Sequence, residues 1–202
     1  MPLLAPAPHS DRRYPFDDEI RDLASPLVWT VEPFFSQQEC AALIARFEAI
    51  GFGEAPINVG GGFERRPEVR NNERVMFDDV PLAESLLERI RAHVPAKMFA
   101  DPLALCGVNE RFRGYRYDPG QQFRDHLDGR FARSASETSL LTFMIYLNDD
   151  FAGGSTRFSD LGIDVVPRHG VALFFQHALR HAGVTVDRGR KYVLRTDVMY
   201  RR

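Results

Sequence analysis

The apolar and polar positions in the first half of the chain predict two strands and two helices. Residues 28–35 fit a first strand. Ser36 and Glu39 then form a capping-box pattern, in which the Ser side chain accepts from a first-turn amide and Glu39 reaches back. Apolar residues follow at helical spacing as far as a stop at Gly51: Cys40, Leu43, Ile44, Phe47 and Ile50. A short strand at 74–77 and a second helix with Pro81 in its first turn come next.

The second half of the chain has a different pattern, with short apolar or alternating runs separated by Gly, Asp, Asn and Pro. These runs are 104–117, 138–147, 154–158, 163–166, 171–176, 182–186 and 191–200. Strands at this spacing predict a sandwich or barrel. We therefore expect an α+β protein, a double-stranded β-helix (jelly roll) supported by N-terminal helices.

The same pattern suggests how the chain is divided. Residues 1–25 carry several prolines among charges and are expected to form a flexible N-terminal arm, followed by a single domain at 26–202. Within that domain, residues 51–72 have neither helical nor strand periodicity. A loop of this length is usually functional or mobile, so it is either a lid or an ordinary excursion of the chain.

Composition excludes some functions and leaves others open. The 202 residues, 44% of them hydrophobic, suffice for one core, and the formal charge of −2 argues against binding nucleic acid or a membrane through bulk charge. Cys40 and Cys106 lack metal-type spacing and are expected to be reduced core residues. Since no apolar run could span a bilayer and no signal-peptide pattern is present, the cytoplasm is the expected location. The oligomeric state is not determined by the sequence.

A candidate metal site begins with His126 and Asp128. Residues two apart in an extended segment point the same way, so the imidazole and the carboxylate would converge. A pair of this kind also occurs in ordinary loops. A second histidine is needed downstream, and the candidates are His169, His177 and His181. Two histidines and one carboxylate would leave open positions on Fe(II), although Zn, Mn or Co could also bind.

Two of the predicted strands could line a cavity. In 191–198, alternation places Lys191, Val193, Arg195 and Asp197 on one face, which would normally face solvent but could point inward around a polar ligand. In 138–147, one face is wholly apolar, and the other is mixed and includes Tyr146. Arg111 and Arg113 share a face of a third strand, which indicates either an anionic substrate or an arginine-rich exterior.

From about residue 30 onward, the chain resembles the prolyl 4-hydroxylase-like branch of the Fe(II)/2-oxoglutarate-dependent dioxygenases. The matching stretches are 115–128, 140–148, 153–158 and 170–192, with a further likeness at the start of the first helix, 34–40. The resemblance implies His181 as the third metal ligand, because the family places a basic residue ten positions after that histidine, as Lys191 is here. His177 is then a neighbouring or packing residue, and His169 a turn residue.

The resemblance also implies the co-substrate site. Lys191 would bind the far carboxylate of 2-oxoglutarate, Tyr146 would support it, and Tyr117 would line the same pocket. Arg195 could be a second anchor, a substrate contact or an ion-pair partner of Asp197. The implied cofactors are Fe(II) and 2-oxoglutarate, with ascorbate as a further candidate. No catalytic residue beyond the metal ligands is expected.

The implied function is hydroxylation of a peptide side chain or a small molecule by dioxygen, with release of succinate and carbon dioxide. The stretch at 70–74 departs from the family's substrate-side loop, so specificity for prolyl residues does not carry over. The main alternative is a non-catalytic jelly-roll module that binds a ligand. A metal-dependent hydrolase or isomerase is a further alternative. Neither the binding module nor such an enzyme requires a cation at position 191.

Overall fold

The computed structural model describes residues 20–58 and 62–202. It contains two helices, α1 (Gln37–Ile50) and α2 (Val80–Ile90). The strands of the first half are β1 (Val28–Val31), β2 (Gly53–Glu54), β3 (Ile57–Asn58), β4 (Phe63–Glu64), β5 (Glu73–Asp78), β6 (Lys97–Met98) and β7 (Leu103–Val108). Those of the second half are β8 (Arg111–Tyr117), β9 (Phe123–His126), β10 (Glu137–Tyr146), β11 (Ala152–Gly153), β12 (Thr156–Phe158), β13 (Ile163–Val165), β14 (Ala172–Gln176), β15 (His181–Gly183), β16 (Val186–Arg188) and β17 (Lys191–Arg201).

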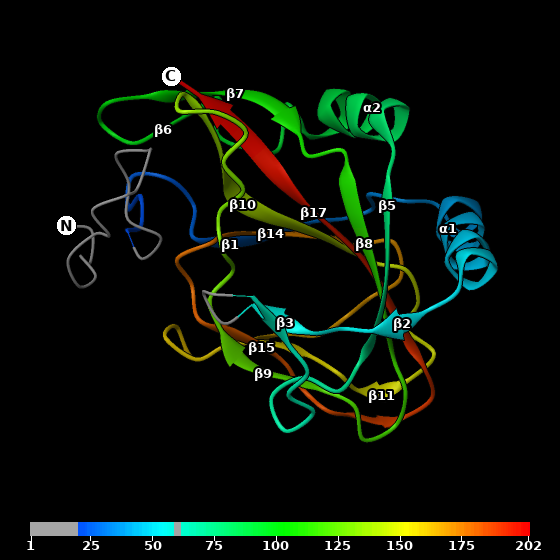
Figure 1. Ribbon diagram of the computed structural model, residues 1–202. Helices are drawn as coiled ribbons and strands as arrows, with labels where there is room; N and C mark the ends of the chain where they lie inside the picture. The colour runs from blue at the N-terminus through cyan, green and yellow to red at the C-terminus, as the bar shows by residue number, and fades with distance from the viewer. Residues whose placement is uncertain (1–19, 59–61) are drawn as a thin grey trace.

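Most of the strands form a large and a small antiparallel sheet, and β3–β4 and β11–β16 are separate two-stranded pairs. The large sheet has the order β1-β14-β10-β17-β8-β5-β2, with β7 and β6 added beside β17, and the small sheet has the order β13-β12-β15-β9. Figure 1 shows α1 and α2 on the outer side of the large sheet, and β9 and β15 on its other side. The predicted α+β jelly roll with N-terminal supporting helices is confirmed.

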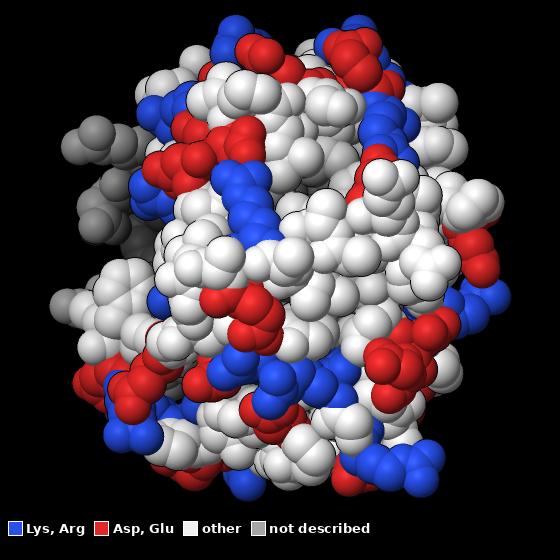
Figure 2. Space-filling view, turned by 90° about the vertical axis from the view of Figure 1, so that its right-hand side faces the viewer, with Lys and Arg blue, Asp and Glu red and all other residues white. Residues whose placement is uncertain are grey.

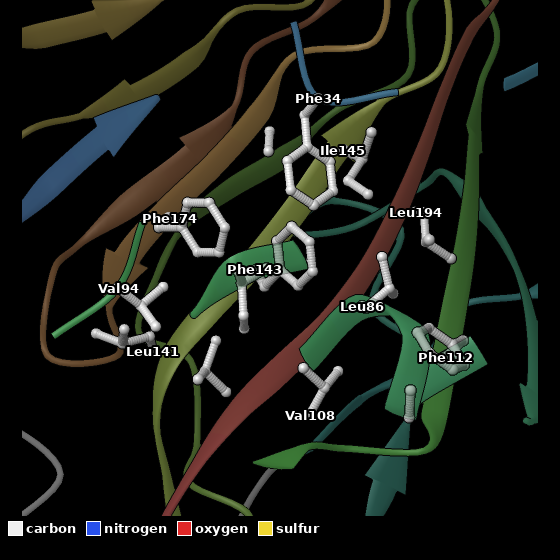
Figure 3. Packing of buried hydrophobic residues seen from close by; sticks show 14 of the residues in the cluster. Phe34, Leu86, Val94, Val108, Phe112, Leu141, Phe143, Ile145, Phe174 and Leu194 are labelled. Atoms are coloured by element: carbon white, nitrogen blue, oxygen red, sulfur yellow. The ribbon is translucent and has the colours of Figure 1, made fainter. Parts of the chain in front are cut away.

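The outer face of the large sheet packs on the two helices. Phe143 of β10 stacks on Phe174 of β14, with ring centroids 4.6 Å apart, and meets the edge of Phe34 at 5.4 Å. Figure 3 shows these rings beside Leu86 of α2 and Leu194 of β17. This is the apolar face that alternation predicts for 138–147, and the opposite faces of β10 and β17 look toward the small sheet.

We expect Phe143→Ala to lower the free energy of unfolding by about 3–5 kcal/mol, because the rigid sheet and helices cannot close the cavity. Urea or guanidinium denaturation followed by circular dichroism measures the loss. Phe63→Ala is the matched control: that side chain is 71% exposed, and the change should stay within about 0.5 kcal/mol. Equal losses in the two variants would contradict this packing.

Several predicted elements differ in extent from the observed ones. The strand expected at 28–35 ends at Val31, because Pro33 has no amide hydrogen for the sheet. The run 104–117 forms two strands, β7 and β8, joined at Asn109 and Glu110, where the Asn109 amide donates to the Asp197 carbonyl at 2.8 Å. The loop predicted at 51–72 contains the short strands β2, β3 and β4, while 59–61 lie outside the described residues.

Residues 1–19 of the predicted arm, 1–25, lie outside the described residues. Asp22, in the described part of the arm, packs against the domain. Asp22 is buried, and its amide donates to Gln176 Oε1 at 2.8 Å. The Asp22 carboxylate accepts from Ser25 Oγ at 2.7 Å and from the Phe99 amide at 2.9 Å. These contacts attach Asp22 to the domain, and the division into an arm and a single domain stays a prediction.

Candidate metal and co-substrate site

A pocket between the two sheets is lined by histidine and charged side chains from three strands and one loop. The small sheet contributes His126 of β9 and His181 of β15, and the loop after β9 contributes Asp128. Lys191 and Arg195 of β17 reach the pocket from the large sheet. The charged face of β17 therefore points inward, as a strand beside a polar ligand would require: Lys191 is 2% exposed and Asp197 is 1% exposed.

His126, Asp128 and His181 form a compact donor group. His126 and His181 are directly opposite each other in the β9–β15 pair. His126 Nε2 lies 3.7 Å from Asp128 Oδ1, and His181 Nε2 lies 3.5 Å from Asp128 Oδ2. All three donor atoms lie within 4.8 Å of one another, and within 20–58 and 62–202 no other group of three such residues does so.

The hydrogen bonds of the two histidines engage Nδ1 of each ring and leave Nε2 free for a metal. The Nδ1–H of His126 donates to the Arg124 carbonyl at 2.8 Å, and that of His181 donates to the Leu179 carbonyl at 3.0 Å. In a neutral imidazole, a protonated Nδ1 leaves a lone pair on Nε2. Both Nε2 atoms face Asp128, so the two rings are oriented as ligands.

Burial keeps these rings neutral. It lowers the pKa of His126 to about 3, with the neighbouring His181 contributing, and it lowers the pKa of His181 as well. Burial raises the pKa of Asp128, but the charge of Arg195 outweighs it and holds that pKa well below its usual value. Metal ligands must be deprotonated, so the donor set is in its binding form at neutral pH. Two imidazoles and one carboxylate fit Fe(II) with coordination positions left over.

A chain of hydrogen bonds from Thr142, His177 and Ser139 holds the Asp128 carboxylate in place. A carboxylate can only accept, so the Thr142 hydroxyl donates to Asp128 Oδ2 at 2.6 Å. Thr142 must then accept from His177 Nδ1 at 3.0 Å, and His177 Nε2 accepts from Ser139 Oγ at 2.8 Å. Both nitrogens of His177 are thus engaged away from the donor group. The chain fixes the orientation of Asp128.

The other end of the pocket contains a buried lysine without an acidic partner. Lys191 Nζ donates to the Gly154 carbonyl at 2.6 Å and lies 5.3 Å and 5.4 Å from the ring centroids of Tyr117 and Tyr146. No ion pair of Lys191 is present in the described part of the chain, and burial lowers its pKa to about 7. A buried ammonium group of this kind would gain from an anionic ligand.

Thr156 belongs to this end of the pocket and was not predicted. Its Oγ1 lies 2.7 Å from the Tyr146 hydroxyl, and Thr156 shares the buried face of β12 with Phe158. Alternation within 154–158 gives a weak signal for that face. Gly154 stands just before it at φ +66°, where a Cβ would lie 3.3 Å from Lys191 Cδ. Glycine thus leaves room for the lysine stem.

The structure separates the remaining candidates. Arg195 Nη2 lies 3.2 Å from Asp197 Oδ1, so the ion pair considered for it is present, and it also lies 3.0 Å from Asp128 Oδ2. Arg113 turns inward to Asp197 at 3.3 Å, whereas Arg111 is exposed and pairs with Asp78 at 2.9 Å. His169 lies in a turn remote from the donor group, where its amide donates to Asp149.

Comparisons with known proteins agree with this architecture. Residues 112–196 match the family model described as the 2OG-Fe(II) oxygenase superfamily. Prolyl 4-hydroxylase subunit alpha-1 of Gallus gallus is 30% identical over 100 residues, which cover 42% of this chain and 19% of the relative. The aligned part is thus about a fifth of that relative's length.

Solved structures give the same fold. A viral collagen prolyl hydroxylase from Paramecium Bursaria Chlorella virus-1, in complex with 2OG, superposes with a TM-score of 0.64 at 22% identity, covering 86% of this chain and 96% of that one. A prolyl-4-hydroxylase of Pseudomonas putida gives a TM-score of 0.61 at 20% identity, with 90% and 96% covered. The predicted resemblance to the prolyl 4-hydroxylase-like Fe(II)/2-oxoglutarate oxygenases is confirmed. No helix among the described residues could cross a membrane.

Proposed function

We propose that the protein is an Fe(II)- and 2-oxoglutarate-dependent dioxygenase that hydroxylates its substrate. The observation that carries this proposal is one pocket that holds the His126–Asp128–His181 donor group in its metal-binding form and, further along, the buried amino group of Lys191. The donor group suits the metal, and the lysine suits the far carboxylate of 2-oxoglutarate. Neither a ligand-binding module nor a hydrolase needs this combination.

Separate sets of residues would bind the metal and the co-substrate. His126, Asp128 and His181 would hold Fe(II), and Lys191, with Tyr146, Tyr117 and the Thr156 hydroxyl, would bind and orient 2-oxoglutarate. Bound Fe(II) and 2-oxoglutarate supply the oxidative chemistry, in which dioxygen gives one oxygen atom to succinate, formed with carbon dioxide, and the other to a substrate C–H bond. The apolar walls of the pocket, including Met144, exclude water.

The substrate class is a further part of the proposal. The similar proteins are named as prolyl hydroxylases, which favours hydroxylation of a peptide side chain, and a small molecule is the alternative. Ascorbate remains a candidate cofactor.

The two cysteines are unpaired, which is compatible with the proposed cytoplasmic location. The 51–72 segment is proposed as a lid, since Val69 and Asn71 are hydrogen-bonded to Arg124 and Gln122, in and just before β9 beside the pocket.

The proposal is tested by adding Fe(II) and 2-oxoglutarate to the protein without oxygen. We expect a visible absorption band that needs both components, and succinate formation once air is admitted. A folded protein that gives neither result would favour the non-catalytic module. Binding of the metal alone, without any effect of 2-oxoglutarate, would favour the hydrolase or isomerase.

Thr142→Val should weaken metal binding by about 10- to 100-fold, because it removes the hydroxyl that orients Asp128 while keeping the side-chain volume. Titration with Fe(II) or Mn(II) measures the change. Thr138→Val is the matched control, since Thr138 is a buried threonine of the same strand whose hydroxyl contacts only backbone carbonyls. Equal affinities in the two variants would show that the hydrogen bond to Asp128 does not matter.

A further inference from the structure

Four arginines surround Tyr115 at the metal end of the pocket. Arg195 and Arg113 reach it from β17 and β8, and the burial of Tyr115 is offset by the charges of Arg195, Arg70 and Arg113, which lower its pKa. Arg74 is crowded by the other three, and burial together with these like charges lowers its pKa. A cluster of this kind is costly unless anions balance it.

The acidic groups in this cluster are too few. Arg113 and Arg195 share Asp197, at 3.3 Å and 3.2 Å, and Arg195 also contacts Asp128 at 3.0 Å. Asp128 is in turn a proposed metal ligand, so a divalent cation would compete with Arg195 for its charge. In the described part of the chain, four guanidinium groups therefore face two carboxylates, and a bound metal adds further positive charge.

Arg70 is the most unusual member of the cluster. It is 7% exposed, and its guanidinium lies between the rings of Tyr115 and Phe123, 4.7 Å and 4.4 Å from their centroids. Its Nε donates to Oδ1 of the neutral Asn72 at 2.8 Å. Nη2 of Arg70 and Nε of Arg195 are buried without any hydrogen-bond partner among the described residues. Leaving a buried donor unpaired costs about 1–3 kcal/mol, and more when it is charged.

Arg195 lines the metal pocket directly, whereas Arg70 packs on two rings of its wall, Tyr115 and Phe123, and borders a neighbouring pocket. Tyr115, Phe123 and Arg195 line the pocket together with His126 and Asp128. Residues 70–74 pass next to β9, where Arg70 forms an isolated bridge with Phe123. The molecular surface differs from this interior: Figure 2 shows blue and red side chains interspersed on the face that carries α1, and Arg46 there pairs with Asp79 at 2.6 Å.

Resting on the proposed function, we infer that the substrate carries a carboxylate, which is bound by Arg70 and Arg195 beside the metal while Lys191 holds 2-oxoglutarate. Guanidinium groups recognise carboxylates through charge-assisted hydrogen bonds. The carboxylate belongs either to a free small molecule or to a peptide end. In both cases it would supply the anion that the cluster lacks.

The test uses matched pairs of acids and amides. N-acetyl amino acids and short peptides, each as the free C-terminal acid and as the primary amide, are titrated into oxygen-free protein saturated with Fe(II) and 2-oxoglutarate. Thermal stabilisation and a shift of the absorption band report binding without turnover. We expect acids to bind at least tenfold more tightly than their amides. The two arms, amino acids and peptides, distinguish the source of the carboxylate.

Variants locate the site of the preference. Arg70→Gln should reduce the ratio of acid affinity to amide affinity by about tenfold. Arg111 is an exposed arginine at the start of β8, the strand that also carries Arg113, and Arg111→Gln should leave this ratio unchanged. Equal binding of acids and amides by the wild type, or the same ratio in Arg70→Gln, would overturn the inference. Should Arg70→Gln not fold, the wild-type comparison alone decides. A missing absorption band would instead refute the proposed function.

Discussion

The His181→Ala variant is expected to lose the absorption band that Fe(II) and 2-oxoglutarate produce together, and to form no succinate. His181 Nε2 is one of three donors facing a single point, and alanine leaves only His126 and Asp128 there. Direct titration with Mn(II) should show the corresponding loss of metal affinity. Because His181 is buried, circular dichroism and thermal unfolding must first show that the variant is folded.

His177→Ala is the control for this experiment. His177 is also buried, but both its nitrogens are bonded to Thr142 and Ser139, so the variant should keep the band and bind metal more weakly. Retention of the band in His181→Ala together with its loss in His177→Ala would show that the ligand assignment is wrong.

Lys191→Met is expected to weaken 2-oxoglutarate binding by about 10- to 100-fold, since hydrogen bonds to charged groups contribute about 1.5–3 kcal/mol. The protein without ligands should become more stable. Folding lowers the Lys191 pKa from 10.5 to about 7, so the unfolded chain holds its proton more tightly. The cost of burying the ammonium is present in full below pH 7 and disappears as the pH rises toward 10.

The pH dependence gives this prediction two measurable signs. The gain in melting temperature of Lys191→Met over wild type should be largest below pH 7 and should shrink at higher pH. Wild-type affinity for 2-oxoglutarate should fall as the pH rises above about 7, because the lysine of the free protein loses its charge. Lys97→Met, which removes an exposed lysine, should change neither property. A destabilised Lys191→Met with unchanged 2-oxoglutarate affinity would contradict both expectations.

Local sequence patterns predicted the parts of the fold that short-range physics determines. The capping box at Ser36 and Glu39 is present, with the Glu39 amide donating to Ser36 Oγ at 3.2 Å and Glu39 accepting from the Ser36 amide at 2.8 Å. Alternation in 138–147 and 191–198 correctly separated the apolar face on the helices from the polar face in the pocket. The period of a strand contains this information directly.

Contacts between distant segments could not be predicted in this way. Nothing local to Arg70 indicates that it lies between Tyr115 and Phe123, and nothing near Asp22 indicates its hydrogen bond to Gln176. Thr156 and the Thr142–His177 chain depend on which strands of the two sheets face each other. Even the choice of His181 needed the family spacing, because residue types alone left three histidines open.

Strand β17 holds both ends of the pocket on one continuous backbone. At about 3.3 Å per residue, Lys191 and Arg195 are held about 13 Å apart by a strand that is paired on both sides with β10 and β8. One inserted residue between them would turn Arg195 and Asp197 toward the helices and bring apolar side chains into the pocket. We therefore expect related proteins to vary their substrates by exchanging side chains along this strand, while its length stays constant.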